Sequence, residues 1–189
     1  TISGVSHYDI QIGTDFFWKD LPDSTDSDLN DIYFTSGLNG WMVGAGGTIM
    51  EVDSFSVSEY ASPTTDDLFG VSFADPNNGI AVGEGGVILY FDGTEWTEES
   101  NSPASDDLND VAFISTTDAW AVGIEGGVYH YDGTEWTAAG PSTSNDLYDV
   151  SFSDASNGII SGDGGAVFVY NGTDWTEMSA GSKDLFGVH

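Results

Sequence analysis

Short segments rich in β-branched and aromatic residues recur along this chain, and Gly, Asp, Asn or Pro bounds each of them. These are properties of β-strands, and no stretch has the sustained periodicity of an amphipathic helix. Within residues 128–131, Tyr129 and Tyr131 form one face, while Val128 makes the opposite face apolar as well. Because a strand with two apolar faces is buried between stacked sheets, the pattern predicts an all-β protein of stacked sheets.

The strand pattern repeats along the chain. Each repeat opens with Asp-Leu, and successive openings are 39, 40, 39 and 38 residues apart. In the third unit, "DLNDVAF" is the first strand segment, "AWAVG" the second and "VYHYD" the third, and Trp136 marks the fourth. Small sheets of four strands, stacked about an axis, are the blades of a β-propeller.

Glycine-rich turns support this assignment. The second and third segments are joined by "GAGG" (44–47), "GEGG" (83–86) and "GDGG" (162–165), and by "GIEGG" (123–127) with one extra residue. The third and fourth segments are joined by Asp-Gly or Asn-Gly pairs, such as Asp132-Gly133. Such pairs favour the type I′ turn of a tight hairpin, so adjacent strands are antiparallel.

The two ends of the chain complement each other. "TISG" at the start matches "IISG" (159–162), a second strand, and "DLFGVH" at 184–189 matches a first strand. We therefore predict one domain, with blades at approximately 28–66, 67–106, 107–145 and 146–183, and a split blade of 184–189 plus 1–27. The predicted fold is a five-bladed β-propeller of four-stranded antiparallel blades. Its ring is closed by N- and C-terminal strands in one shared blade, which leaves no free sheet edge.

The motifs "DLNDVAF", "AWAVG" and "YDGTEWT" resemble the BNR or Asp-box-like β-propeller repeats, including those of photosystem II assembly-factor type. The resemblance extends over nearly all of the chain. It implies propeller blades, here in a five-bladed variant, and it implies no particular ligand or reaction.

The chain is strongly acidic, with 32 Asp and Glu against two Lys and a net charge of −30. Such a charge repels phosphates and anionic headgroups, which argues against nucleic acid as a partner, and no apolar run is long enough for membrane insertion. A magnitude of roughly 2–8 suffices for solubility, and a larger charge destabilises a compact state unless salt screens it. We therefore expect adaptation to high salt and an extracellular or cell-surface location. The absence of Cys excludes disulfides and thiolate metal sites.

Five aspartates open the repeats, and a closed ring places them around the channel mouth: Asp28, Asp67, Asp107, Asp146 and Asp184. A ring of carboxylates suits Ca²⁺ or another hard cation, the one cofactor class that we consider. A repeated Asx turn, in which each Asp caps its own connector, explains the same positions.

A second set of aspartates, Asp31, Asp110 and Asp149, lies further into the innermost strand of three units. We expect these carboxylates to line the central channel and to be candidates for ligand binding. Gly70 and Gly187 occupy the corresponding positions of the other units, so a symmetric ion site is not expected.

The connectors from the fourth strand of one unit to the first strand of the next vary most and are rich in Ser, Thr and Pro. Variable loops on a rigid scaffold commonly form binding sites. No catalytic residue is assigned, because no Ser-His-Asp spacing or phosphate loop stands out. We predict a non-enzymatic binding or structural module for a protein or glycan partner, of undetermined oligomeric state. The alternative is a glycan-acting hydrolase or lyase, or a lectin, that uses acidic residues near the channel.

Overall fold

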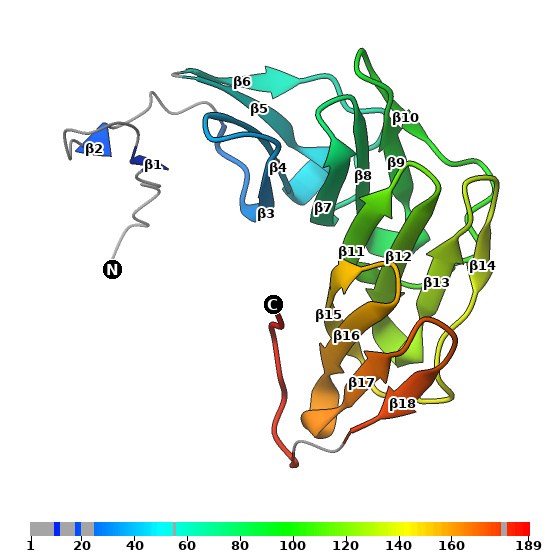
Figure 1. Cartoon of the computed structure of the whole chain (residues 1–189). Coiled ribbons are helices and arrows are strands. Elements are labelled where there is room, and N and C mark those ends of the chain that lie inside the picture. The colour runs from blue at the N-terminus through cyan, green and yellow to red at the C-terminus, as the bar shows by residue number, and fades with distance from the viewer. Residues whose placement is uncertain (1–9, 12–17, 20–24, 55, 179–180) are drawn as a thin grey trace.

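The computed structural model in Figure 1 describes residues 10–11, 18–19, 25–54, 56–178 and 181–189. Most of its regular structure lies in four antiparallel sheets, each of four strands hydrogen-bonded in chain order. The prediction of an all-β fold built from small four-stranded antiparallel sheets is confirmed. In the described ranges, no helix has the length and apolarity needed to cross a membrane.

We call the four sheets blades 1 to 4. Blade 1 consists of β3 (Leu29–Phe34), β4 (Asn39–Gly44), β5 (Ile49–Asp53) and β6 (Ser56–Tyr60). Blade 2 consists of β7 (Leu68–Asp75), β8 (Asn78–Gly83), β9 (Ile88–Phe91) and β10 (Trp96–Glu98). Blade 3 consists of β11 (Leu108–Ser115), β12 (Asp118–Gly123), β13 (Val128–Tyr131) and β14 (Trp136–Ala138). Blade 4 consists of β15 (Leu147–Asp154), β16 (Asn157–Gly162), β17 (Val167–Tyr170) and β18 (Trp175–Glu177).

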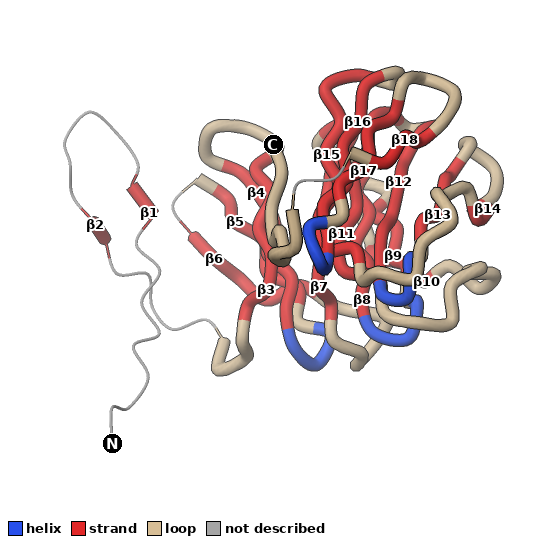
Figure 2. Tube along the Cα trace, turned by 90° about the horizontal axis from the view of Figure 1, so that it is seen from below, coloured by secondary structure: helices blue, strands red, loops and turns tan. Residues whose placement is uncertain are grey.

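The first strands of the blades lie side by side around the centre of the molecule, with β3 next to β7, β7 next to β11, and β11 next to β15. The later strands of each blade lie progressively further out, and the four blades form an arc (Figures 1 and 2). This is the radial arrangement that the repeat predicts.

A 3-10 turn of three residues joins the second and third strands of every blade. The four turns are η1 (Ala45–Gly47), η2 (Glu84–Gly86), η3 (Ile124–Gly126) and η4 (Asp163–Gly165). The middle residue has a positive φ in each: 64° at Gly46, 62° at Gly85, 53° at Glu125 and 61° at Gly164. The predicted extra residue at 123–127 is therefore wrong. Glu125 occupies the place of a glycine, and Gly127 occupies the place that Val87 has in blade 2.

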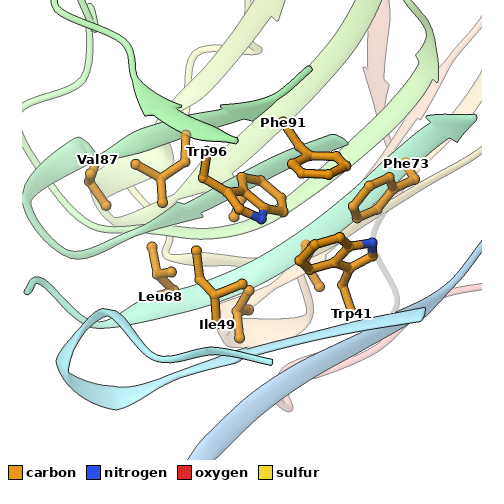
Figure 3. Packing of buried hydrophobic residues seen from close by; sticks show 11 residues of the cluster. Trp41, Ile49, Leu68, Phe73, Val87, Phe91 and Trp96 are labelled. Carbon is orange, nitrogen blue, oxygen red and sulfur yellow. The ribbon is translucent and has the colours of Figure 1, made fainter. Parts of the chain in front are cut away.

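The hydrophobic cores lie between neighbouring blades. Between blades 1 and 2, Trp41 packs on Phe73, Phe91 and Trp96, with ring centroids 4.7–5.8 Å apart (Figure 3). Trp120 packs in the same way on Phe152, Tyr170 and Trp175 between blades 3 and 4. Buried aromatic pairs contribute about 0.5–1.5 kcal/mol each beyond their buried area, so these clusters hold the blades together.

The tryptophans of the described blades serve packing, as the repeat predicts. Trp41, Trp96, Trp120 and Trp136 are each at most 5% exposed. At the middle junction Ile80 takes the place of Trp41, and the Trp136 indole N–H donates to the Tyr90 hydroxyl. These rings are not free to stack on a sugar.

The predicted fifth, shared blade is not formed by the described residues, and the sheets are not closed into a ring. Among the described residues, β1 (Ile10–Gln11) pairs with β2 (Trp18–Lys19) as a separate two-stranded sheet. Residues 184–189 have no strand assignment, although they contact blade 4 through hydrogen bonds. Most of residues 1–24, which the sequence assigns to this blade, lie outside the described residues.

Candidate functional site

The aspartates that open the repeats lie at the junctions between blades. The Asp67 carboxylate accepts a hydrogen bond from the Gly46 N–H at 2.7 Å, and Asp107 accepts one from Gly85 at 2.8 Å. Asp146 accepts from the Glu125 N–H at 2.9 Å, and Asp184 from Gly164 at 3.1 Å. Each donor is the middle residue of the 3-10 turn in the preceding blade, so each carboxylate ties one blade to the hairpin of the blade before it.

This contact differs from an Asx turn, in which each Asp would cap its own connector. The turn that would precede Asp28 lies outside the described residues. Calcium binding by the five aspartates stays a prediction. Within the described ranges, no three His, Asp or Glu side chains come close enough together to hold a metal ion.

The structure brings Asp31, Asp110 and Asp149 together in one cavity at the centre of the arc. Its volume is about 470 Å³, and β3, β7, β11, β15 and the C-terminal residues Val188 and His189 line it. A register shift between Leu108 and Asp110 interrupts the pairing of β11 with β12, just before the channel aspartate. Such a bulge re-aims the side chain that follows it.

Each channel carboxylate also accepts a backbone hydrogen bond, Asp31 and Asp110 from the next blade and Asp149 from the C-terminal segment. Asp31 accepts from the Val71 N–H at 2.8 Å, and Asp110 from Val150 at 2.8 Å. Asp149 accepts from the Val188 N–H at 2.6 Å. Ligand binding by these residues is untested, and the contacts give all three a structural role.

Gly70 interrupts this series for a steric reason. A Cβ at Gly70 would lie 2.9 Å from the Asp110 Cα, closer than real contacts allow. The glycine therefore lets β11 approach β7, at the expense of a carboxylate in this place. Asp110 on β11 and Asp149 on β15 are therefore the channel aspartates that lie on adjacent strands.

Asp110 and Asp149 are neighbouring carboxyls in the channel, joined by a side-chain hydrogen bond. Burial raises the pKa of the Asp110 carboxyl well above its ordinary value, and a hydrogen bond with the Asp149 carboxylate raises it further. The pKa of Asp31 is also raised, first by burial and to a smaller extent by the charge of Asp149. A carboxyl with a raised pKa keeps its proton to a higher pH than usual, and while protonated it can donate a hydrogen bond or a proton.

Sequence reasoning missed two junction residues, Asn30 and Asn109. The Asn30 side-chain amide donates to the Leu68 carbonyl at 2.8 Å, and Asn109 donates to the Leu147 carbonyl at 2.7 Å. The available signal was the Asn of "DLND", which occurs in the first and third repeats alone. Both asparagines reach the start of the following blade.

Two grooves open on the rim that carries the 3-10 turns; we call them rim grooves. Each lies between the turn of one blade and the connector that follows the fourth strand. The groove on blade 1 has a volume of about 400 Å³, and its lining includes Gly46, Glu59, Tyr60 and Ser62. The groove on blade 2 has a volume of about 430 Å³, and four acidic side chains line it: Asp66, Glu84, Glu98 and Glu99.

The sequence matches no family model and no curated protein. Among solved structures, YCF48 bound to D1 peptide is similar to this chain with a TM-score of 0.68 and 19% identity, over 95% of this chain and 58% of that one. YCF48 from Cyanidioschyzon merolae is similar with a TM-score of 0.67 and 22% identity, over 87% of this chain and 60% of that one.

Propellers of other types are similar too. The β-propeller domain of Cps50 (Swd1) from Myceliophteria thermophila has a TM-score of 0.70 and 9% identity, over 87% of this chain and 59% of that one. The WD40 β-propeller domain of Doa1 has a TM-score of 0.66 and 11% identity, over 85% of this chain and 57% of that one. The chain thus spans about three-fifths of the length of these structures. At such low identity the likeness establishes the architecture alone: this chain has the fold of β-propeller blades.

Proposed function

We propose that this chain is a non-enzymatic binding module, a five-bladed propeller of BNR/Asp-box-like repeats that presents one rim to a protein partner. The rim is the one that carries the 3-10 turns and the connectors. The observation that carries the proposal is the recurrence of a groove at the same place on blades 1 and 2. A repeated, solvent-open groove is suited to an extended segment that crosses several blades.

The charge of the rim indicates what kind of segment it binds. In the blade 2 groove, Asp66, Glu84 and Glu98 are exposed, and Glu99 is half-buried. Within the described ranges, the one contact of a basic side chain with a carboxylate is the hydrogen bond between His130 Nε2 and Asp118, which do not line this groove. Since no lysine or arginine lines the groove, its carboxylates attract a cationic partner. A peptide segment rich in Lys or Arg therefore fits this rim.

The comparisons support a peptide ligand in a limited way. One of the similar propellers, YCF48, is described as bound to a D1 peptide. The D1 peptide is a ligand of YCF48 and is not carried over to this chain. The net charge of −30 on this chain favours a cationic peptide.

A labelled peptide of alternating Lys and Ser tests the proposal by fluorescence anisotropy. The triple variant Glu84→Gln, Glu98→Gln, Glu99→Gln keeps the acceptor oxygens that bond the Asp67 and Asn101 N–H groups and removes three charges. The matched control Glu95→Gln, Glu135→Gln, Asp174→Asn removes three exposed charges at the opposite ends of the blades.

We expect the groove variant to bind the peptide roughly tenfold more weakly and the control to bind almost like the unmodified chain, because screened charges act only nearby. Equal losses in both variants would mean that overall charge, and not this rim, attracts the peptide. Absence of binding to the unmodified chain, at the lowest salt concentration at which it keeps its native near-ultraviolet spectrum, would refute the role of the grooves.

The second candidate is a glycan-acting hydrolase or lyase that uses the channel acids. The channel cavity holds Asp110, a carboxyl with a raised pKa, in hydrogen-bond contact with Asp149. The two catalytic carboxyls of glycosidases are roughly 5–9.5 Å apart, so this close pair does not have the spacing of a glycosidase. Release of reducing ends from a panel of polysaccharides, abolished by Asp110→Asn, would support this function. Retention of a glycan without cleavage would instead support a lectin.

The setting of the protein is proposed from its charge alone. We propose an extracellular or cell-surface module adapted to high salt, in which hydrated cations cover the carboxylates. Detection of the native protein in the external fraction of its source cells would support this location, and its recovery from the cell interior alone would contradict it.

A further inference from the structure

One hairpin turn of blade 4 differs in sequence from its counterparts in blades 2 and 3. It joins β17 to β18 and reads Asn171-Gly172-Thr173, where blades 2 and 3 have Asp92-Gly93-Thr94 and Asp132-Gly133-Thr134. Asn171 is the one asparagine of the chain that is followed by any residue except Pro and then by Ser or Thr. This pattern of three residues is the acceptor sequence for N-linked glycans, and it belongs to surface turns of exported proteins.

The turn presents the atoms that glycosylation uses. Asn171, Gly172 and Thr173 are all exposed. The Asn171 Oδ1 accepts hydrogen bonds from the backbone N–H groups of Thr173 and Asp174, at 3.0 and 2.9 Å. The Asn171 Nδ2 and the Thr173 hydroxyl form no hydrogen bond with any of the described residues. The carbonyl oxygen of this amide therefore holds the turn, and its nitrogen is free to react.

The equivalent turns of blades 2 and 3 lack this arrangement. The Thr94 hydroxyl donates to the Asp92 carboxylate at 2.6 Å, and the Thr134 hydroxyl donates to Asp132 at 2.6 Å. A carboxylate has no nitrogen that could carry a glycan. A glycosylated asparagine keeps its carbonyl oxygen, so a glycan on Asn171 leaves both backbone hydrogen bonds of the turn in place.

The turn lies at the end of blade 4 that is remote from the 3-10 turns. η4 joins β16 to the beginning of β17, and residues 171–174 follow the end of β17, so the two turns are at opposite ends of this strand. The rim grooves lie beside the 3-10 turns of blades 1 and 2. A glycan on this turn therefore leaves the rim grooves open.

We propose that Asn171 is an N-glycosylation site, with an oligosaccharide linked to a lipid diphosphate as the donor. In the transfer, a bond forms between the Asn171 Nδ2 and the first sugar carbon, and the bond from that carbon to the donor phosphate breaks. The lipid diphosphate leaves with the bonding electrons, and the amide proton goes to a base of the transferase. The proposal rests on the extracellular or cell-surface setting proposed above, because N-linked glycans belong to exported proteins.

Peptide mass spectrometry of the native protein from its source cells tests the proposal. We expect the peptide that contains Asn171 to carry a glycan in most molecules of the external fraction. Treatment with peptide N-glycosidase should release the glycan and convert Asn171 to Asp, which the peptide mass reports. An unmodified Asn171 on the external protein would overturn the proposal and leave the location intact. A protein found in the cell interior alone, with Asn171 unmodified, would contradict both.

Matched variants test the acceptor itself. The chain is translated behind a cleavable signal peptide in the presence of microsomes, and cleavage of the signal peptide identifies the translocated molecules. Thr173→Ala removes the acceptor sequence and keeps the backbone hydrogen bonds of the turn, whereas Asp132→Asn gives the same sequence to the turn of blade 3. We expect a glycan on the unmodified chain, none on Thr173→Ala and a second one on Asp132→Asn. Translocated chains without a glycan at Asn171 would overturn the proposal, and so would a glycan that persists in Thr173→Ala.

Discussion

At the scale of single residues, the same side chain has different roles at different places in a blade. Asp92 and Asp132 lie in exposed turns, where hydrogen bonds from the Thr two residues later hold the pKa of each carboxyl below its ordinary value. Asn171 has this place in blade 4 and accepts the same backbone hydrogen bonds. Asp110 lies in the channel, where burial raises its pKa. The surroundings of the carboxyl, and not the residue type, therefore distinguish the turn aspartates Asp92 and Asp132 from Asp110 in the channel.

The pKa of Asp110 predicts a pH-dependent stability. The pKa of Asp110 in the folded chain lies above the ordinary value of 3.8, so the folded state binds this proton more tightly than the unfolded state does. The resulting contribution to the free energy of unfolding is fully present below pH 3.8. That contribution is lost as the pH rises through the raised folded-state pKa. Asp110→Asn imitates the protonated acid and keeps an acceptor for the Val150 N–H. We expect it to raise the unfolding midpoint by several degrees at pH 8 and to change it little near pH 3.

Calorimetry at both pH values tests this prediction, and Asp132→Asn serves as the control because its position tolerates Asn in blade 4. An Asp110→Asn variant that is equally or less stable than the unmodified chain at pH 8 would contradict the assignment of a buried carboxyl with a raised pKa.

At the scale of elements, the sequence was sufficient to locate the strands of blades 1 to 4 and the turns between them, because each repeat carries its own local signals. Only the length of the turn at 123–127 was wrong. The junction contacts were not predictable in the same way. Whether Asp67 reaches its own connector or the Gly46 N–H depends on how two repeats are placed in space. Asp31, Asp110 and Asp149 were placed in the channel by counting from the repeat, since their strand is the innermost. Asn30 and Asn109 were missed because an Asn beside a strand start has many local interpretations.

Glu125 provides a test of the turn geometry. It has a φ of 53° where the other three turns have glycine. A left-handed conformation costs a non-glycine residue about 1–2 kcal/mol, and glycine adds about 0.5–1 kcal/mol of backbone entropy to the unfolded chain. Glu125→Gly should therefore stabilise the fold by about 0.5–1 kcal/mol in urea denaturation.

The reverse change supplies the control. Gly85 has a φ of 62°, and a Cβ there would meet no atom within 4 Å, so Gly85→Ala introduces backbone strain alone. We expect Gly85→Ala to destabilise the fold by about 1 kcal/mol. If both substitutions left the denaturation midpoint unchanged, the positive φ of these turns would not be a source of strain.

At the scale of the whole molecule, two features dominate: blades that bury aromatic clusters between them, and a net charge of −30 that opposes compaction. The sequence repeat was sufficient to predict the stacked blades and to predict which tryptophans pack between them. Closure of the ring was predicted by counting the strands that the two chain ends supply. The described residues leave the ring open between blade 4 and blade 1. Blade number depends on whether the two chain ends meet; the local patterns at the ends predict a fifth blade, but the described residues do not form it.

The charge predicts salt-dependent folding. The Debye length falls from about 10 Å at 0.1 M to about 3 Å at 1 M salt, which weakens repulsion among the surface carboxylates. We expect a native near-ultraviolet circular dichroism spectrum at molar NaCl and its loss below about 0.1 M. Equal spectra at both salt concentrations would remove the argument for a high-salt setting.

The central claim is that one junction, repeated along the chain, holds the blades together and also holds residues 184–189 on blade 4. Amide hydrogen exchange of Val188 tests it most directly, because this N–H donates to Asp149 in the way that Val71 and Val150 donate to Asp31 and Asp110. We predict that Val188 and Leu185 are protected to a degree comparable with Val71 and Val150. Exchange of Val188 and Leu185 at the rate of an unstructured chain, with Val71 and Val150 still protected, would contradict the account.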